Sequence, residues 1–302
     1  MQPSEIRVSV IIPTFNEERN IGRTLRSIFT QSKLVAYGEQ VKGFSLEIIV
    51  IDSGSTDRTV DIVRRFARKH GLVHLYTVRR FHHSIVRNVA AKVASGNILV
   101  FLNADASPAN EEWLPELIRP ILLGYAASFS RQIPPRHIVS IDCAMCLAGF
   151  PPNDMIIDAK NYRLVFARYG VLLSTVSCAV CREVFEDLGG FNPRVPVNED
   201  QEFALRLIMR GHKIYYASRS VVIHAHSLSL RGVFRRYRAY GEGWKAIHRI
   251  HRSQRLGYSP RLAVDVISIL LGKGRREAQW SPRLLLQAFV AAIAFLVGRY
   301  VS

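Results

Sequence analysis

The sequence predicts an α/β fold built on a mostly parallel sheet with helices on both faces. The first observation is a series of continuous apolar runs that have the length of buried strands. The second is that segments with helical spacing of apolar residues alternate with these runs. The third is that 302 residues with 48% hydrophobic composition are ample for one or two domains. Strands that are apolar on both faces belong to sheets that helices cover on both sides.

The expected elements alternate along the first third of the chain. The predicted strands cover residues 8–12, 48–51, 72–78 and 98–102. The predicted helices cover residues 20–31, 57–71 and 84–96. Thr56 or Asp57 is the expected N-cap of the second helix, and Gly71 and Gly96 are the expected stops of the second and third.

Polar residues come directly after three of the predicted strands, in the turns Pro13–Asn16, Asp52–Gly54 and Asn103–Asp105. Ligands of such sheets bind beyond the carboxyl ends of the strands, so we expect the three turns to meet in one crevice. The alternative role for an acid here is to cap the next helix. That alternative suits Asp57 better than Asp52 or Asp105, because these two follow their strands without an intervening turn.

The charge of the chain predicts an anionic partner. The formal net charge is +17, and Arg, the better fork for phosphate, outnumbers Lys. A nucleotide, a nucleic acid or a lipid headgroup would fit. Neither GxGxxG nor GxxxxGK[ST] occurs at the three turns, which argues against dinucleotide and P-loop sites. Carboxylates repel a diphosphate unless a divalent cation such as Mg²⁺ or Mn²⁺ lies between them.

Four cysteines form two CxxC pairs, Cys143/Cys146 and Cys178/Cys181. A zinc site is one interpretation. The interval between the pairs is long, and residues three apart on a strand face opposite sides, so we favour buried thiols. No secretory signal is visible at the N-terminus.

Four segments occur in the order that one known family has: SVIIPTFNEERNIGRTLRSI, IIVIDSGSTDRT, FLNADASP and LGGFNPRVPVNEDQEFALRLIMRGHKI. From about Val8 to Gly243 the chain resembles the inverting family 2 glycosyltransferases, which have the GT-A fold. Within that family it resembles membrane-associated dolichyl- or polyprenyl-phosphate sugar transferases of the archaeal mannosyltransferase type.

The resemblance implies roles for matching positions. The residues implied to bind the nucleotide sugar are Pro13, Thr14, Phe15, Glu17, Asp52, Ser53, Arg87, Asn103 and Ala104. Among them, Asp52 would hydrogen-bond the base and Arg87 would approach the diphosphate or sugar. Asp105 and His224 would bind Mn²⁺ or Mg²⁺, with His226 in reserve. Asp200 would be the general base, with Glu199 beside it.

One departure from the family pattern and three alternatives bear on these roles. The first position of the metal motif is Asn103 instead of Asp, so metal binding would lean on Asp105 and the substrate phosphates. The pair Glu199-Asp200 would alternatively be a solvated helix start. Arg87 would alternatively be a surface charge. His224 and His226 alternate on an expected strand, so only one of them should face the site.

The C-terminal third predicts attachment to a membrane. Residues 229–255 have aromatic and apolar residues at helical spacing among many Arg, and Gly241 and Gly243 are expected to break this helix. Residues 284–297 carry no charge and lie between Arg283 and Arg299. This run would span a thinned bilayer, pair with residues 262–271 as a re-entrant hairpin, lie in the interface, or form a buried soluble helix.

We therefore predict a catalytic domain at 1–228 and a membrane-associated region at 229–302. The best-fitting activity is metal-dependent transfer of mannose from GDP-mannose to dolichyl or polyprenyl phosphate, on the cytoplasmic side of the cell membrane and without nucleic acid. The alternatives are a UDP- or dTDP-sugar transferase acting on a glycan hydroxyl, a nucleotidyltransferase, and a basic nucleic-acid-binding protein.

Overall fold

The structure is a computed structural model that describes residues 6–29, 45–79, 82–135, 140–254, 256–257, 260–270 and 282–300. Its strands are β1 (Arg7–Thr14), β2 (Ser45–Asp52), β3 (Val73–Thr77), β4 (Ile98–Leu102), β5 (Ser107–Pro108), β6 (Ala127–Ile133), β7 (Met155–Ile157), β8 (Ser177–Cys181) and β9 (Ile214–Ile223). Its helices are α1 (Ile21–Phe29), α3 (Thr59–Lys69), α4 (His83–Val93), α5 (Trp113–Leu122), α6 (Ile141–Gly149), α7 (Tyr162–Tyr169), α8 (Arg182–Asp187), α9 (Glu199–Met209), α10 (Leu230–Ile250), α11 (Pro260–Leu270) and α12 (Pro282–Tyr300).

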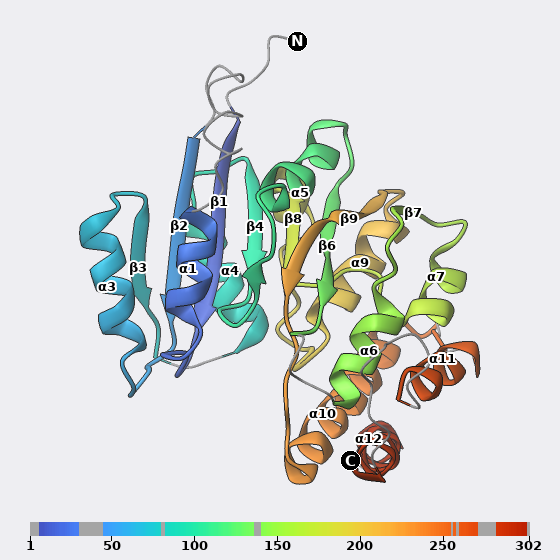
Figure 1. Cartoon of the computed structure of the whole chain (residues 1–302). Coiled ribbons are helices and arrows are strands. Elements are labelled where there is room, and N and C mark those ends of the chain that lie inside the picture. The colour runs from blue at the N-terminus through green and yellow to red at the C-terminus, as the bar shows by residue number, and fades with distance from the viewer. Residues whose placement is uncertain are drawn as a thin grey trace.

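All strands join one nine-stranded sheet in the order β3-β2-β1-β4-β8-β6-β9-β5, with β7 added against β9 (Figure 1). The half formed by β3, β2, β1 and β4 is entirely parallel, as predicted. The other half is mixed, because β8 runs antiparallel to both β4 and β6 while β9 runs parallel to β6. The predicted α/β class is confirmed, and this sheet with its helices is the GT-A fold.

Helices cover both faces of the sheet because each central strand is apolar on both sides. On β1, Val10 and Ile12 pack with α1, α3 and α5, whereas Ile11 packs on the other face with α4, α8 and α9. These three side chains are 0% exposed, as expected for alternation on a strand covered twice. The turns at the carboxyl ends of β1, β2 and β4 therefore lie at one edge of a rigid scaffold.

The cysteines do not form a metal site among the described residues. Cys143 and Cys146 lie on α6, and Cys178 and Cys181 lie on β8. None of the four is in a disulfide. Burial raises the pKa of the Cys178 thiol, which keeps it protonated.

Helix α10 runs unbroken through Gly241 and Gly243, so the predicted break is wrong. The glycines instead allow backbones to touch: a side chain at Gly241 would overlap the carbonyl oxygen of Phe295 on α12, and one at Gly298 would overlap that of Arg238 on α10. Helices α10 and α12 thus cross at very close range, at the lower end of the molecule in Figure 1. By length and composition, Arg283–Tyr300 is able to cross a membrane, and 28% of this stretch is buried in the protein.

Candidate active site

The three polar turns meet as predicted at the carboxyl-end edge of the parallel strands. Thr14 at the end of β1 donates its hydroxyl to Asp52 Oδ1 at the end of β2, at 3.1 Å. The turn after β4 is tied to α1, because the Thr24 hydroxyl donates to the Ala104 carbonyl at 2.7 Å. Residues that are far apart in sequence therefore lie together at this edge of the sheet.

Asp52 is buried, and hydrogen bonds from its own turn and from Thr14 occupy both oxygens of its carboxylate. The backbone N–H groups of Gly54 and Ser55 donate to Oδ2 at 3.0 and 2.9 Å, and the Ser55 hydroxyl joins Thr14 in donating to Oδ1. A carboxylate has about four acceptor positions, and all four are used. Asp52 thus fixes the shape of the turn, and its bond to a base stays a prediction. The neighbouring Ser53 is 4% exposed.

The turn after β1 presents one aromatic ring and one acid. Pro13 is buried, whereas Phe15 is 47% exposed. Asn16 adopts a positive φ of 55° and is held by the second turn, since its backbone N–H donates to Ser55 Oγ at 2.8 Å. Burial, together with the nearby charge of Asp105, raises the pKa of Glu17. An exposed ring beside polar groups suits stacking of a base.

Asp105, His224 and His226 form a three-residue cluster with the chemistry of a metal site. Nε2 of His224 lies 3.6 Å from Asp105 Oδ1, and Nε2 of His226 lies 3.6 Å from Oδ2. All three ligand atoms lie within 4.8 Å of one another. Ligands bound at about 2.1 Å to one ion stand roughly 3–4 Å apart, so small adjustments suffice. The residues present therefore fit a divalent cation.

The expectation that only one of the two histidines faces the site is wrong. It assumed strand alternation, but β9 ends at Ile223 and residues 224–229 are irregular. The chain turns after Ile223 and brings both imidazoles to Asp105, with their ring centroids 4.8 Å apart. His226 thus joins His224 in the candidate ligand set.

The ring of His224 is oriented by a partner on β6. Its Nδ1 lies 3.0 Å from Gln132 Oε1, and Gln132 Nε2 donates to Ser174 Oγ at 2.8 Å. Because the amide nitrogen is committed to Ser174, the amide oxygen accepts from His224 Nδ1–H. This tautomer leaves a lone pair on Nε2, which is buried without a hydrogen-bond partner and lies on the Asp105 side. Such an outer hydrogen bond is typical of metal-ligating histidines.

Both imidazoles are held neutral, as a metal ligand must be. Burial lowers the pKa of His224, and the charge of Arg236 lowers it further. Burial, Arg236 and the neighbouring ring lower the pKa of His226 to about 4. The Arg236 guanidinium is itself bound to Asp142 at 2.6 Å, which fixes its position. At neutral pH the cluster therefore carries one negative charge, on Asp105.

Arg87 is a buried bridge between the turn after β4 and helix α9. It is 2% exposed, so the alternative of a surface charge is wrong. One terminal nitrogen donates to Asn103 Oδ1 at 2.8 Å, and the other donates to Glu199 Oε1 and the His83 carbonyl, both at 3.1 Å. The side-chain oxygen of Asn103, where the family pattern has Asp, therefore accepts a hydrogen bond from Arg87. Contact of Arg87 with a diphosphate stays a prediction.

Asp200 is the acid at the start of α9 that is suited to proton transfer. Glu199 is 4% exposed and paired with Arg87, so the alternative of a solvated helix start is wrong. Asp200 is partly exposed and accepts from the backbone N–H of Thr175 at 3.1 Å and of Gln201 at 2.8 Å. Burial and the adjacent Glu199 charge raise the pKa of Asp200 to about 6. A carboxylate with this pKa is well matched to general-base catalysis near neutral pH.

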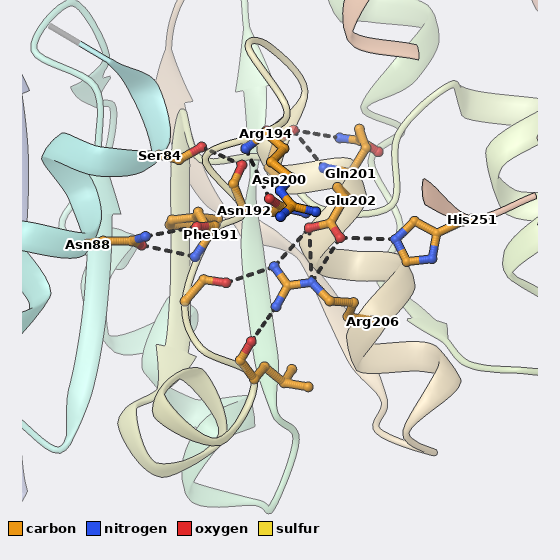
Figure 2. Close-up of polar contacts among 12 residues, drawn as sticks. Ser84, Asn88, Phe191, Asn192, Arg194, Asp200, Gln201, Glu202, Arg206 and His251 are labelled. Atoms are coloured by element: carbon orange, nitrogen blue, oxygen red, sulfur yellow. Dashed lines mark hydrogen bonds and ion pairs between the residues drawn. The ribbon is translucent and has the colours of Figure 1, made fainter. Parts of the chain in front are cut away.

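Helix α9 is anchored below Asp200 by a charged network (Figure 2). The buried Glu202 pairs with Arg206 at 2.8 Å and lies 3.0 Å from Nε2 of His251, the C-cap residue that follows α10. Arg206 also donates to the carbonyls of Leu188 and Gly190. The helix that carries Asp200 is thus fixed to the loop before it and to the C-terminal helices.

Two bridges join Asp200 to the Asp105–His224–His226 cluster. One runs from Glu199, which adjoins Asp200, through Arg87 to Asn103, which lies two residues before Asp105. The other uses consecutive residues: Ser174 accepts from Gln132, which orients His224, while Thr175 donates to Asp200. Asp200 and the cluster therefore have a fixed separation.

Sequence reasoning did not find Gln132, Ser174 or Thr175. A single Gln in a segment for which no strand was predicted and a Ser-Thr pair in a loop carry no distinctive pattern. Their roles depend on contacts between segments that are 25 to 92 positions apart. Only an explicit three-dimensional pairing identifies them.

Comparisons with known proteins find several glycosyltransferases among the relatives of this chain. Residues 9–138 match the family described as glycosyl transferase family 2. The O-antigen chain rhamnosyltransferase RfbN of Salmonella typhimurium is 28% identical over 98% of this chain and 90% of its own length. The O-antigen chain rhamnosyltransferase WbaN of Salmonella anatum is 29% identical over 84% of this chain and 80% of its own.

A solved structure supports the fold. The mannosyltransferase PcManGT from Pyrobaculum calidifontis, in complex with GDP-Man and Mn²⁺, aligns with a TM-score of 0.63 at 22% identity. The alignment covers 99% of this chain and 87% of that one. At this identity the likeness concerns the fold.

Proposed function

We propose that this chain is an inverting family 2 glycosyltransferase, which its match over residues 9–138 and its GT-A fold support. It would transfer a 6-deoxyhexose such as rhamnose from a nucleoside diphosphate sugar to a hydroxyl of a lipid-linked glycan. Two relatives that this chain matches over most of their length are O-antigen rhamnosyltransferases. The activity named for these relatives supports rhamnose over the mannose that we expected from the sequence.

The observation that carries the choice of acceptor is the setting of Asp200, which is held at the start of α9 by the backbone N–H groups of Thr175 and Gln201 and lies beside Glu199, so that its pKa is raised. A sugar hydroxyl attacks an anomeric carbon well only when a base removes its proton. A lipid phosphate is already ionised at neutral pH and needs no base. A carboxylate whose pKa is raised toward neutrality therefore favours a hydroxyl acceptor over dolichyl or polyprenyl phosphate.

Different residues of the chain would serve different parts of a single displacement at the anomeric carbon. Phe15 and the Asp52 turn would hold the base and ribose at the ends of β1 and β2. Asp200 would accept the acceptor proton as the oxygen attacks the anomeric carbon from the side opposite the nucleotide, which inverts the configuration. Asp105, His224 and His226 would hold a divalent cation, which supplies positive charge to the departing nucleoside diphosphate.

The donor atoms of the cluster favour Mn²⁺ over Mg²⁺. Mg²⁺ prefers an all-oxygen environment, whereas two imidazole nitrogens beside one carboxylate suit a transition metal. We also propose that the protein works at the cytoplasmic face of a membrane, attached through residues 229–302. A lipid-linked acceptor would be available there.

The test is a donor and acceptor panel with purified full-length protein and Mn²⁺. The donors are dTDP-rhamnose, a UDP-sugar and GDP-mannose, and the acceptors are a polyprenyl-diphosphate-linked glycan and polyprenyl phosphate. We expect nucleoside diphosphate release and inverted product with dTDP-rhamnose and the glycan. Asp200→Asn should lose this activity, and Asp61→Asn, an exposed acid on α3, should retain it. Transfer only to polyprenyl phosphate, unaffected by Asp200→Asn, would refute the proposal.

A further inference from the structure

Helix α12 exposes an unbroken apolar stripe. Phe289, Leu296 and Tyr300 are 64%, 52% and 69% exposed, and Leu285 and Ile293 are also exposed. The spacing of these five residues is four, four, three and four, which places them on one side of a helix. Solvent-exposed apolar residues of this size in a continuous line mark an interaction surface.

The opposite side of α12 is committed to the protein. Leu284 and Ala291 are 6% and 4% exposed and pack with residues of α6, α10 and α11, and Ala294 is 0% exposed. Gly298 lies against the backbone of Arg238 on α10. A helix that crosses a bilayer alone would expose this side to lipid and lose that crossing.

Gln287 is the strongest argument against a spanning helix. It is the only strongly polar residue in the uncharged run 284–297, and it is 3% exposed. Its Nε2 donates to the Leu228 carbonyl at 3.2 Å, and its Oε1 accepts from the Ile141 backbone N–H at 3.3 Å. Moved into hydrocarbon, this amide would lose both partners, which costs several kcal/mol in a medium without hydrogen bonds.

The C-terminal helices carry more basic than acidic residues, which suits an anionic bilayer. Helix α10 carries six Arg or Lys residues, α11 carries one and α12 carries two. The carboxylates of these helices are Glu242 and Asp265, and both are already paired with Arg. Apolar side chains with a basic surround are typical of helices that lie in the headgroup region of anionic membranes.

We propose that α12 lies flat in the headgroup region of an anionic bilayer, with its Leu285–Tyr300 stripe inserted, and does not cross it. This proposal refines the proposed function and depends on it only for the lipid-linked acceptor. The two backbone partners of Gln287 lie close to a candidate metal ligand. Leu228 is two residues from His226. Ser140, which precedes Ile141, donates its hydroxyl to the His226 carbonyl at 2.8 Å. The membrane helix thus directly supports the segment that carries the candidate metal ligands.

The binding test uses full-length protein and vesicles of phosphatidylcholine alone or with phosphatidylglycerol, without donor or acceptor. We expect wild type to bind the anionic vesicles, and Phe289→Gln/Leu296→Gln to lose at least tenfold in affinity. The matched control is Leu123→Gln/Leu164→Gln, which changes two exposed leucines outside α12 and should bind as wild type. Undiminished binding of the stripe variant would overturn the proposal.

The depth test separates lying from spanning. Phe289→Trp is reconstituted with phospholipids brominated at shallow or deep acyl positions, and the membranes are extracted with alkaline carbonate. We expect stronger quenching by the shallow bromines and release by carbonate; deep quenching with resistance to extraction would overturn the proposal. This single substitution also decides the question if the double variant does not fold. Because no sugar is involved, failure here leaves the transferase assay unaffected, and a failed transferase assay leaves vesicle binding unaffected.

Discussion

Replacing Gln132 with Leu should weaken metal binding without touching a ligand. Gln132 is 6% exposed on β6, and its amide oxygen lies 3.0 Å from His224 Nδ1. Leu removes this acceptor, so the imidazole loses the bond that fixes its tautomer and ring angle. Loss of such a partner typically costs about 10- to 100-fold in metal affinity, which is about 1.4–2.7 kcal/mol.

The same substitution also affects stability, and the two effects need separating. The Ser174 hydroxyl and His224 Nδ1 lose a buried partner, which costs about 1–3 kcal/mol of folding free energy. Gln132→Glu keeps an acceptor for His224, so its Mn²⁺ affinity should equal or exceed that of wild type. Gln254→Leu removes another hydrogen-bonded amide, bound to Tyr162, and serves as the control.

The assay is calorimetric titration of Mn²⁺ with and without nucleoside diphosphate, on variants whose circular dichroism shows a native fold. Pulsed electron paramagnetic resonance of bound Mn²⁺ should show nitrogen couplings from two imidazoles in wild type. Unchanged Mn²⁺ affinity in folded Gln132→Leu, or a spectrum without nitrogen coupling, would refute the assignment of His224 as a ligand.

Three further predictions concern the rest of the site. Because the folded pKa of Asp200, about 6, lies above its ordinary value of 3.8, wild-type stability falls as pH rises between these values. Asp200→Asn should therefore be more stable at pH 7 by up to about 3 kcal/mol in urea titrations, an advantage absent below pH 4, while transfer drops about 10²–10⁴-fold; equal stability at both pH values contradicts this. Arg87→Met leaves Glu199 buried without its cation and should cost about 3–5 kcal/mol, part of which Glu199→Gln restores; a loss under about 1 kcal/mol argues against the bridge. Gly298→Leu should separate α12 from α10 at Arg238 and speed amide hydrogen exchange in both helices, whereas unchanged exchange would show that the close crossing is dispensable.

The parallel half of the sheet was predictable because its buried strands are continuous apolar runs of adjacent residues. The run 98–102 coincides with β4, and all five residues are buried. The mixed half gave a weaker signal, since β6 places Ser128, Ser130 and Gln132 in the interior. These polar groups are satisfied by distant partners; Ser130 lies 2.7 Å from both Ser177 and Ser220. No local pattern announces such pairings.

The site was predictable residue by residue where a turn follows a strand directly. Asp105 and His224 were identifiable as candidate ligands from their positions in the family motifs. His226 was kept only in reserve because strand alternation was assumed to continue through residues 224–226, beyond the end of β9 at Ile223. The Arg87–Glu199 ion pair spans 112 positions, and nothing near either residue indicates it.

Asn103 has a consequence for the order in which ligands arrive and leave. With two neutral imidazoles and the carboxylate of Asp105, the candidate site offers a divalent ion a single negative charge, so the bound ion keeps a net positive charge. Such a site retains a bare ion weakly and becomes tight only when a diphosphate adds its own oxygens. Ion and nucleotide would then enter together and, after transfer, depart together as one complex. Turnover would accordingly depend on the cellular concentration of ion-loaded nucleotide more than on that of the ion itself.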